Sequence, residues 1–306
     1  MDRDGETELS PESAFALLGE RLRLSILFAL YEATERGDHN RGSVAYSELQ
    51  EAVDEPDSGK FNYHLSRLTG QFVEKVDEGY AMRQASKSVV RAVLSGTFTD
   101  DPRFGPVTVD ETCFLCGEPV AVSYGNEHVF TRCRACEGTL ALNYTPPGTL
   151  SALVYPPAGL DERSPAEVLE LAHARFEREI GMLAADTCPE CGGSVDAELV
   201  VCLDHDAGET TRCRTCELSV GAVAELGCTT CGYGRVTPPL LAHVRDPEVL
   251  DLLNVRGTGT DAWERFGVAM TREYEIVDEE EPAIAYRNAG GNRRLRIGAD
   301  LTLVVE

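Results

Sequence analysis

The sequence contains very little lysine: Lys60, Lys75 and Lys87 are the only three, against 25 arginines. It also lacks any run of about 18 apolar residues, which excludes a membrane-spanning helix of the usual kind. The N-terminus, Met1-Asp2-Arg3-Asp4, is acidic and has no apolar segment, so we expect no secretory signal peptide. We therefore expect a cytoplasmic protein with no membrane partner, whose thiols stay reduced.

The motifs of the common enzyme classes are absent as well. The sequence has no HExxH metalloprotease motif, no GxSxG nucleophile elbow and no Walker or GxGxxG phosphate-binding loop. Its cysteines occur in pairs with metal-ligand spacing, so a cysteine nucleophile is not expected either. We predict that the chain is not an enzyme, and we assign it no catalytic residue.

Positive charge is scarce overall, because 52 acidic residues against 28 basic ones give a formal net charge of −24. The acidic residues are spread along the chain rather than gathered in a tail. This favours adaptation to a salt-filled cytosol over an acidic partner-binding segment. A net charge of this sign ordinarily argues against nucleic acid as a partner. The 42% of apolar residues suffices for a packed core, and 306 residues suggest two domains, or three if some are small.

The first hundred residues predict a small helical domain with a β-hairpin. Ser10 can cap a helix that opens with Pro11, and further helices are expected over residues 21–33, 48–53, 59–69 and 85–94. A short strand is expected at residues 44–46 and a hairpin at residues 72–83. This order is typical of a winged helix-turn-helix, with residues 59–69 as recognition helix and residues 72–83 as wing.

The expected recognition helix and wing are locally basic on an acidic chain. Residues 59–91 hold six basic and three acidic residues, and all three lysines lie among them. Phe61, Leu65 and Leu68 recur at helical spacing and predict the core face of the helix. We expect the other positions and the wing to contact DNA through Lys60, Asn62, Tyr63, Ser66, Arg67, Lys75 and Arg83. The alternative is that the winged fold serves as a protein-interaction module.

Ten of the eleven cysteines form five CxxC pairs. In the first group, sixteen residues separate Cys113/Cys116 from Cys133/Cys136, which is the arrangement of a four-cysteine zinc ribbon. Two residues between cysteines let both thiolates bind one tetrahedral ion, and a glycine such as Gly117 suits the tight turn. We predict a structural zinc ion here, with disulfides or redox chemistry as the alternative.

A second cysteine-rich stretch offers eight ligands, enough for two more zinc ions: Cys188, Cys191, Cys202, His205, Cys213, Cys216, Cys228 and Cys231. The alternative is that these two residues bind no metal: Cys202 is then a buried small side chain and His205 a solvent-exposed loop residue. An interleaved pairing joins 188/191 to 213/216 and 202/205 to 228/231, whereas a sequential pairing joins neighbouring pairs. The echo of TRCRAC (residues 131–136) in TRCRTC (residues 211–216) favours 188/191 with 213/216. We expect two to three structural zinc ions per chain.

These patterns together predict an α+β multidomain protein: an N-terminal winged helix-turn-helix, small zinc-ribbon β modules and a small α/β C-terminal part. Ser164 and Glu167 predict a capping box on a helix over residues 165–183. The expected division is a disordered tail (1–9), the winged helix-turn-helix (10–104), a first zinc ribbon (105–160), a helical connector (161–186), a second zinc module (187–238) and an α+β region (239–306).

Several segments resemble one family. Leu17-Leu18-Gly19 followed by RLSILFAL (residues 23–30) resembles the opening helices of ArsR-type winged-helix regulators. DSGKFNYHLSRLTGQFV (residues 57–73), GYAM (79–82), CPECGG (188–193) and CLDH (202–205) are similar to the haloarchaeal branch of that family. The resemblance implies a homodimeric transcriptional regulator that binds double-stranded DNA and carries a zinc-ribbon region after the winged helix. The corresponding helix has no cysteine, so arsenic sensing is not implied.

Two other classes of function remain open from the sequence. A winged helix with a zinc ribbon also resembles archaeal transcription initiation factor E, which implies a protein-binding module that contacts RNA polymerase and the transcription machinery. A thiol redox protein is the third class, and it requires a reactive cysteine of low pKa.

Overall fold

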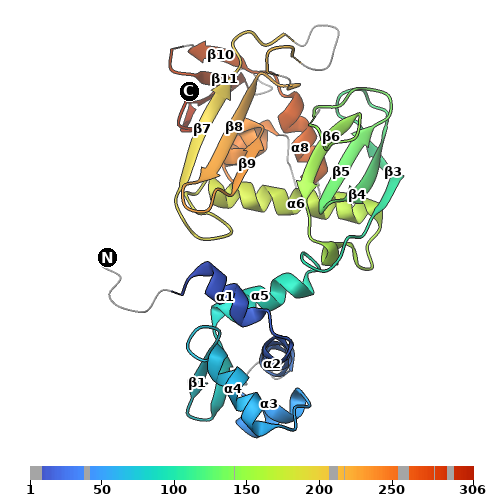
Figure 1. Ribbon diagram of the computed structural model, residues 1–306. Helices are drawn as coiled ribbons and strands as arrows, with labels where there is room; N and C mark the ends of the chain where they lie inside the picture. The colour runs from blue at the N-terminus through green and yellow to red at the C-terminus, as the bar shows by residue number, and fades with distance from the viewer. Residues whose placement is uncertain are drawn as a thin grey trace. The chain divides into compact units, whose positions relative to one another are not determined.

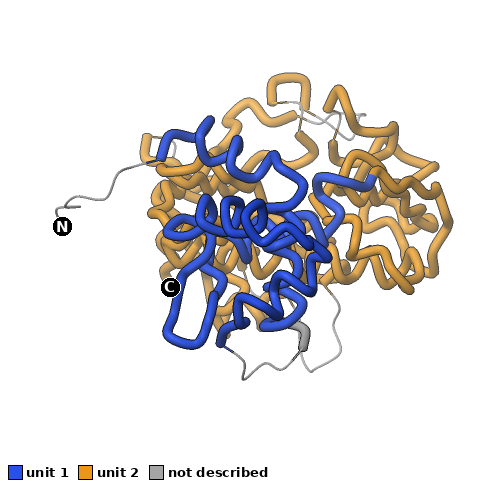
Figure 2. The backbone as a smooth tube through the Cα atoms, turned by 60° about the horizontal axis from the view of Figure 1, so that its bottom comes forward, with its two compact units in different colours: residues 1–100 blue, residues 101–306 orange. Residues whose placement is uncertain are grey.

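The computed structural model describes residues 9–37, 42–140, 142–206, 213–216, 218–253, 262–278, 280–287 and 293–306. The chain divides into two compact units, unit 1 (residues 1–100) and unit 2 (residues 101–306), shown in Figure 1 and coloured separately in Figure 2. Apart from Leu9, the expected disordered tail lies outside the described residues. None of the described helices is both long and apolar enough to cross a membrane.

Unit 1 contains the predicted helices and hairpin in the predicted order. Ser10 caps the first helix as expected, since its Oγ accepts a hydrogen bond from the Ser13 N–H at 3.3 Å. The elements are α1 (Pro11–Leu18), α2 (Arg21–Tyr31), the π-helical turn η1 (Glu32–Gly37), α3 (Tyr46–Ala52), α4 (Ser58–Leu68), β1 (Val73–Val76), β2 (Gly79–Met82) and α5 (Gln84–Leu94).

The strand expected at residues 44–46 is reduced to a single bridge between Val44 and Tyr80. The N–H of each residue donates to the carbonyl oxygen of the other at 2.9 Å, which adds one rung to the β1–β2 hairpin. Gly79 is required beside this bridge because a Cβ there would lie 2.2 Å from the Val44 carbonyl oxygen. The hairpin is thus held against the start of α3 by backbone contacts.

The core of unit 1 is centred on α2. Ile26, Leu27 and Leu30 of this helix have no exposed surface, and α2 contacts α3, α4, α5 and β2. Phe61, Leu65 and Leu68, predicted as the core face of α4, are buried in the same cluster. Because one face of α4 is fixed in the core, its opposite face is presented to solvent.

Unit 2 contains three small antiparallel sheets and five helical segments among its described residues, so the molecule is a mixed α+β structure. The first sheet has the order β3 (Phe104–Thr112), β4 (Pro119–Gly125), β5 (His128–Cys133) and β6 (Thr149–Val154). The second has β7 (Val195–Val201), β8 (Ala222–Cys228) and β9 (Gly234–Thr237), and the third has β10 (Glu275–Asp278), β11 (Ala283–Arg287), β12 (Arg294–Ile297) and β13 (Leu303–Val305). The helical segments are η2 (Pro157–Leu160), α6 (Pro165–Leu183), η3 (Pro239–His243), α7 (Pro247–Leu252) and α8 (Ala262–Thr271).

Helix α6 lies along the first two sheets of unit 2 (Figure 1) and contacts strands of both. It begins at the predicted residue with the predicted capping box: the Ser164 N–H donates to Glu167 Oε2 at 2.8 Å, and the Glu167 N–H donates to Ser164 Oγ at 3.3 Å. Leu169 and Ile180 are fully buried, and one hydrophobic cluster extends through all three sheets. The helix is therefore part of the core of unit 2.

Helix α8 was not expected from the sequence. Its first N–H groups are held by a side chain of α6, because Glu170 accepts from the Ala262 N–H at 2.8 and 2.9 Å and from the Trp263 N–H at 3.3 Å. Trp263 and Phe266 pack edge-on against His173, with ring centroids 5.0 and 5.2 Å away. These contacts fix α8 against α6.

Candidate metal centres

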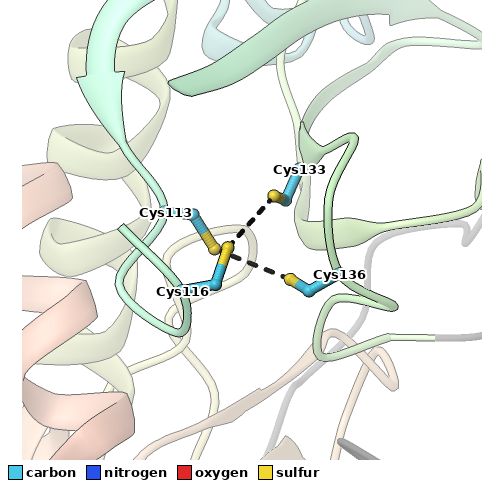
Figure 3. A group of neighbouring side chains, drawn as sticks. All are labelled: Cys113, Cys116, Cys133 and Cys136. Carbon is cyan, nitrogen blue, oxygen red and sulfur yellow. Dashed lines mark hydrogen bonds between the residues drawn. The ribbon is translucent and has the colours of Figure 1, made fainter. Parts of the chain in front are cut away.

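Site 1, formed by Cys113, Cys116, Cys133 and Cys136, brings together the two predicted pairs of the first ribbon (Figure 3). Cys113 and Cys116 lie in the turn between β3 and β4, and Cys133 ends β5. The sulfur atoms of Cys113 and Cys136 are 3.7 Å apart, and those of Cys116 and Cys133 are 3.5 Å apart. All four sulfurs lie within 4.8 Å of one another, so the site is positioned to hold one metal ion.

Site 2 joins Cys188 and Cys191 to Cys228 and Cys231. The first pair precedes β7 and the second begins at the end of β8, where Val195 pairs with Cys228. The sulfur separations are 3.6 Å for Cys188 with Cys231 and 3.5 Å for Cys191 with Cys228. This site therefore joins the turn before β7 to the turn after β8.

Site 3 lies at the other end of the same hairpin and joins Cys202 and His205 to Cys213 and Cys216. The Cys202 N–H donates to the Gly221 carbonyl oxygen at 2.7 Å, which continues the ladder beyond the pair Val201 and Ala222. His205 Nδ1 lies 3.4 Å from Cys216 Sγ. Cys202 and His205 thus belong to a group positioned to hold an ion.

Both pairings considered for residues 188–231 are wrong. The pairs are nested: the outer pairs, 188/191 and 228/231, form site 2, and the inner pairs, 202/205 and 213/216, form site 3. The cause is the antiparallel register of β7 and β8, which places the residues before β7 beside those after β8. The TRCRTC echo marks a similar local turn and carries no information about which pair lies opposite.

Three of the five CxxC turns, those that begin at Cys113, Cys188 and Cys228, share one backbone geometry. The Cys113 N–H donates to the Glu118 carbonyl oxygen at 2.8 Å, and the Gly117 N–H donates to the Cys113 carbonyl oxygen at 2.8 Å. The same two bonds close the turns at Cys188 and Cys228. Gly117 has a φ of 78°, and the equivalent glycines, Gly192 and Gly232, have φ values of 71° and 73°. The predicted role of these glycines is confirmed, because this left-handed conformation disfavours other residues.

Backbone N–H groups in these turns also favour the thiolate form of one cysteine in each site, namely Cys133, Cys228 and Cys213. The N–H of the residue two positions later donates to the sulfur of Cys133, Cys213 and Cys228 at 3.3, 3.3 and 3.4 Å. The backbone N–H of Cys216 lowers the pKa of Cys213 to about 6. The N–H groups of Cys231 and Thr230 likewise lower the pKa of Cys228 to about 6. Thiolate is the form that binds metal ions.

The donor sets fit a tetrahedral thiolate-binding ion. Thiolates about 2.3 Å from such an ion stand about 3.8 Å apart, close to the observed separations of 3.5–3.7 Å. A disulfide requires a separation of about 2.05 Å, and all eleven cysteines are free. Four protein ligands complete a tetrahedral shell, so these sites leave no position for a reacting water.

The residues expected to contact DNA lie on the exposed face of α4 and on the hairpin. Asn62, Tyr63, Ser66 and Arg67 are exposed, with Tyr63 at 56%. Their neighbour His64, by contrast, is 8% exposed. In the hairpin and just after it, Lys75 and Arg83 are exposed.

Several of the six basic residues in 59–91 already have partners within unit 1. Lys60 Nζ lies 2.7 Å from Glu55 Oε2, and Arg83 Nη1 donates to the Gly70 carbonyl oxygen. Glu35 pairs with both Lys87, at 2.7 Å, and Arg91, at 3.2 Å. Of the six basic residues in 59–91, Arg67 and Lys75 have neither an ion pair nor a side-chain hydrogen bond among the described residues, whereas Arg83 has only its bond to the Gly70 carbonyl.

Comparison with protein families gives two matches. Residues 11–93 match the model described as "Domain of unknown function (DUF7347)", and residues 110–305 match the one described as "Domain of unknown function (DUF7351)". The second match spans more than half of the chain, so the chain belongs to the DUF7351 family. The division between the two units, at residue 100, lies between the matches. No curated protein and no solved structure matches the chain.

Proposed function

We propose that the chain is a DNA-binding transcriptional regulator whose unit 1 is an ArsR-like winged helix-turn-helix. The observation that carries this proposal is the division of α4 into two faces. Phe61, Leu65 and Leu68 are buried, while the opposite face presents Asn62, Ser66 and Arg67 to solvent. An amide, a hydroxyl and a guanidinium on one helix face are the groups that read base edges in the major groove.

The hairpin after α4 supports the same proposal. β1 and β2 pair from Val73–Met82 to Val76–Gly79, and Lys75 on the first strand is exposed. In the proposed complex α4 enters the major groove, Arg67 contacts base edges and Lys75 contacts a phosphate as the wing. Lys60 joins them only when it leaves Glu55, and Arg83 serves to hold the hairpin to Gly70.

We further propose that sites 1, 2 and 3 bind zinc in a structural role. Zinc prefers sulfur and imidazole nitrogen in four-coordinate sites, and these are the donors present. Each site joins two separate turns of the chain, and in site 2 these turns are distant in the sequence, as with Cys188 and Cys231. Metal binding of this kind contributes to folding free energy, so zinc stabilises unit 2 without taking part in chemistry.

The proposal includes a homodimer, and two exposed aromatic residues of unit 1 are the positions at which it is tested. Phe15 of α1 is 74% exposed and Phe98, after α5, is 73% exposed. Removal of such apolar side chains from water is favourable, so either residue would stabilise an interface that covered it. We expect the wild-type chain to sediment as a dimer and the Phe15→Ser/Phe98→Ser variant as a monomer. Met182→Ser, which changes a residue 38% exposed in unit 2, serves as control, and a wild-type chain monomeric at every concentration refutes the dimer.

The DNA proposal is tested with duplexes selected from a random library by the zinc-loaded full chain. Arg67→Ala is expected to weaken binding of the best selected duplex about fivefold to hundredfold and to relax base preference. Lys75→Ala is expected to weaken binding evenly across sequences. It is also expected to lower the slope of the logarithm of the binding constant against the logarithm of the salt concentration by about one. Arg178→Ala, an exposed arginine of unit 2, is the control. A library with no enriched sequence, or an Arg67→Ala variant that binds like wild type, overturns the proposal.

A further inference from the structure

Unit 2 contains a cavity of about 300 Å³ that none of the sites above uses. It is lined by β6 and β9, which are edge strands of their sheets, and by residues of α6 and α8. Most of the lining is apolar, including Leu153, Phe176, Val236, Phe266 and Met270. A volume of this size is at the lower end of the range for small-molecule sites in proteins.

Three of the lining residues carry hydroxyl groups without a hydrogen-bond partner among the described residues. They are Ser151 on β6, Thr237 on β9 and Ser219. Ser151 and Thr237 are each 2% exposed. A buried hydroxyl without a partner costs free energy, and rotation about χ1 moves such an oxygen between staggered positions. These hydroxyls are therefore available to a ligand's polar atom.

The lining holds one carboxylate, Glu179, and one guanidinium, Arg235, and these two groups form an ion pair with each other. Glu179 accepts from Arg235 at 2.9 and 3.1 Å and pairs with Arg175 at 2.8 Å. The lining also contains His128, whose ring Nδ1 lies 2.6 Å from the Asn126 carbonyl oxygen. With no uncompensated charge in its lining, the cavity favours a neutral ligand over an ion.

We propose that this cavity binds a small, neutral aromatic molecule that carries a hydroxyl or carbonyl group. Phe176 and Phe266 offer aromatic surface for the ring, and Ser151 and Thr237 offer hydrogen bonds to its oxygen. The site lies wholly in unit 2 and does not depend on DNA binding or on the identity of the metal.

The first test uses 1-naphthol as probe, with naphthalene as its counterpart that lacks the hydroxyl. In calorimetric titrations of the zinc-loaded full chain, 1-naphthol is expected to bind saturably at one molecule per chain. Naphthalene is expected to bind roughly threefold to tenfold more weakly, the effect of one net hydrogen bond. No saturable binding of 1-naphthol refutes the proposal, and equal affinity for the two probes refutes the role of the hydroxyls.

Variants locate the bound probe. Ala152→Phe fills the cavity from β6 and is expected to weaken 1-naphthol binding at least tenfold, whereas Ala185→Phe adds the same bulk at an exposed position and is expected to leave binding unchanged. Ser151→Ala with Thr237→Val is expected to reduce 1-naphthol affinity to that of naphthalene without lowering the melting temperature. This double variant decides the question if Ala152→Phe does not fold. Unchanged 1-naphthol binding in either folded cavity variant overturns the assignment.

Discussion

The nested pairing of the metal sites predicts zinc contents that no other pairing gives. The perturbation is the replacement of cysteine pairs by serine, two pairs at a time. Removal of 188/191 together with 228/231 destroys site 2 alone, whereas removal of 188/191 together with 213/216 destroys sites 2 and 3. We therefore expect three zinc ions in the wild-type chain, two in the first variant and one in the second.

The structure indicates that these losses are independent. Sites 2 and 3 lie at opposite ends of the ladder that runs from Val195–Cys228 to Val201–Ala222. At about 3.4 Å per residue, this ladder separates the two sites by about 20 Å. No ligand is shared between them. Site 1 lies in a different sheet and provides an internal reference, because its zinc is retained in both variants.

The measurement is elemental analysis of the purified full chain, with circular dichroism to show that helices are retained. An interleaved pairing predicts one zinc ion in the first variant and two in the second, the reverse of our expectation. A sequential pairing predicts one in each. A first variant that holds only one zinc ion while remaining folded therefore refutes the nested arrangement, and a wild-type chain with no zinc refutes the assignment of the metal.

Two further predictions concern stability. Ser164→Ala breaks the capping box with Glu167 and is expected to cost about 0.5–2 kcal/mol in urea unfolding, whereas Ser88→Ala on the exposed side of α5 is expected to cost little; equal effects contradict the capping argument. The hydrogen bond from Lys87 lowers the pKa of Glu35, so this pair stabilises the fold above pH 4.5 and loses its effect as the pH falls through the lowered pKa. Lys87→Met is therefore expected to reduce the loss of unfolding free energy on acidification by less than about 1 kcal/mol. The effect is measured as the difference between the wild-type and variant pH profiles, because acid also strips metal from both proteins. Parallel pH profiles for the two proteins contradict this.

Local signals in the sequence predicted local structure well. The cap at Ser10 and the capping box at Ser164 depend on residues three apart, and both are present. The CxxC turns with their glycines depend on six consecutive residues and are also present. Each of these features is stabilised by hydrogen bonds within one turn of chain, so the residue types in one short window determine them.

Features that depend on distant residues were missed. Helix α8 begins where Glu170 accepts its first N–H groups, and Glu170 is 92 residues away from Ala262 in the sequence. The pairing in sites 2 and 3 depends on the register of β7 and β8, and spacing between cysteines does not encode that register. Two short segments rich in valine, alanine and leucine, residues 195–201 and 222–228, were the available signal, since each is flanked by a CxxC turn and the two can pair as a hairpin.

The ion pairs in the structure change the interpretation of the charge composition of the chain. In unit 2, arginine holds one buried and one half-buried carboxylate: Arg235 donates two hydrogen bonds to Glu179, and Arg265 donates two to Glu177. Planar guanidinium groups suit this geometry and lysine does not, which accounts for part of the excess of arginine. In unit 1, two of the three lysines are bound to glutamates, so the local excess of positive charge is smaller than the count of residues suggests. Attraction to phosphates through the remaining cations is weak at high salt. The proposed recognition of DNA therefore depends on the close fit of α4 and its polar face more than on charge.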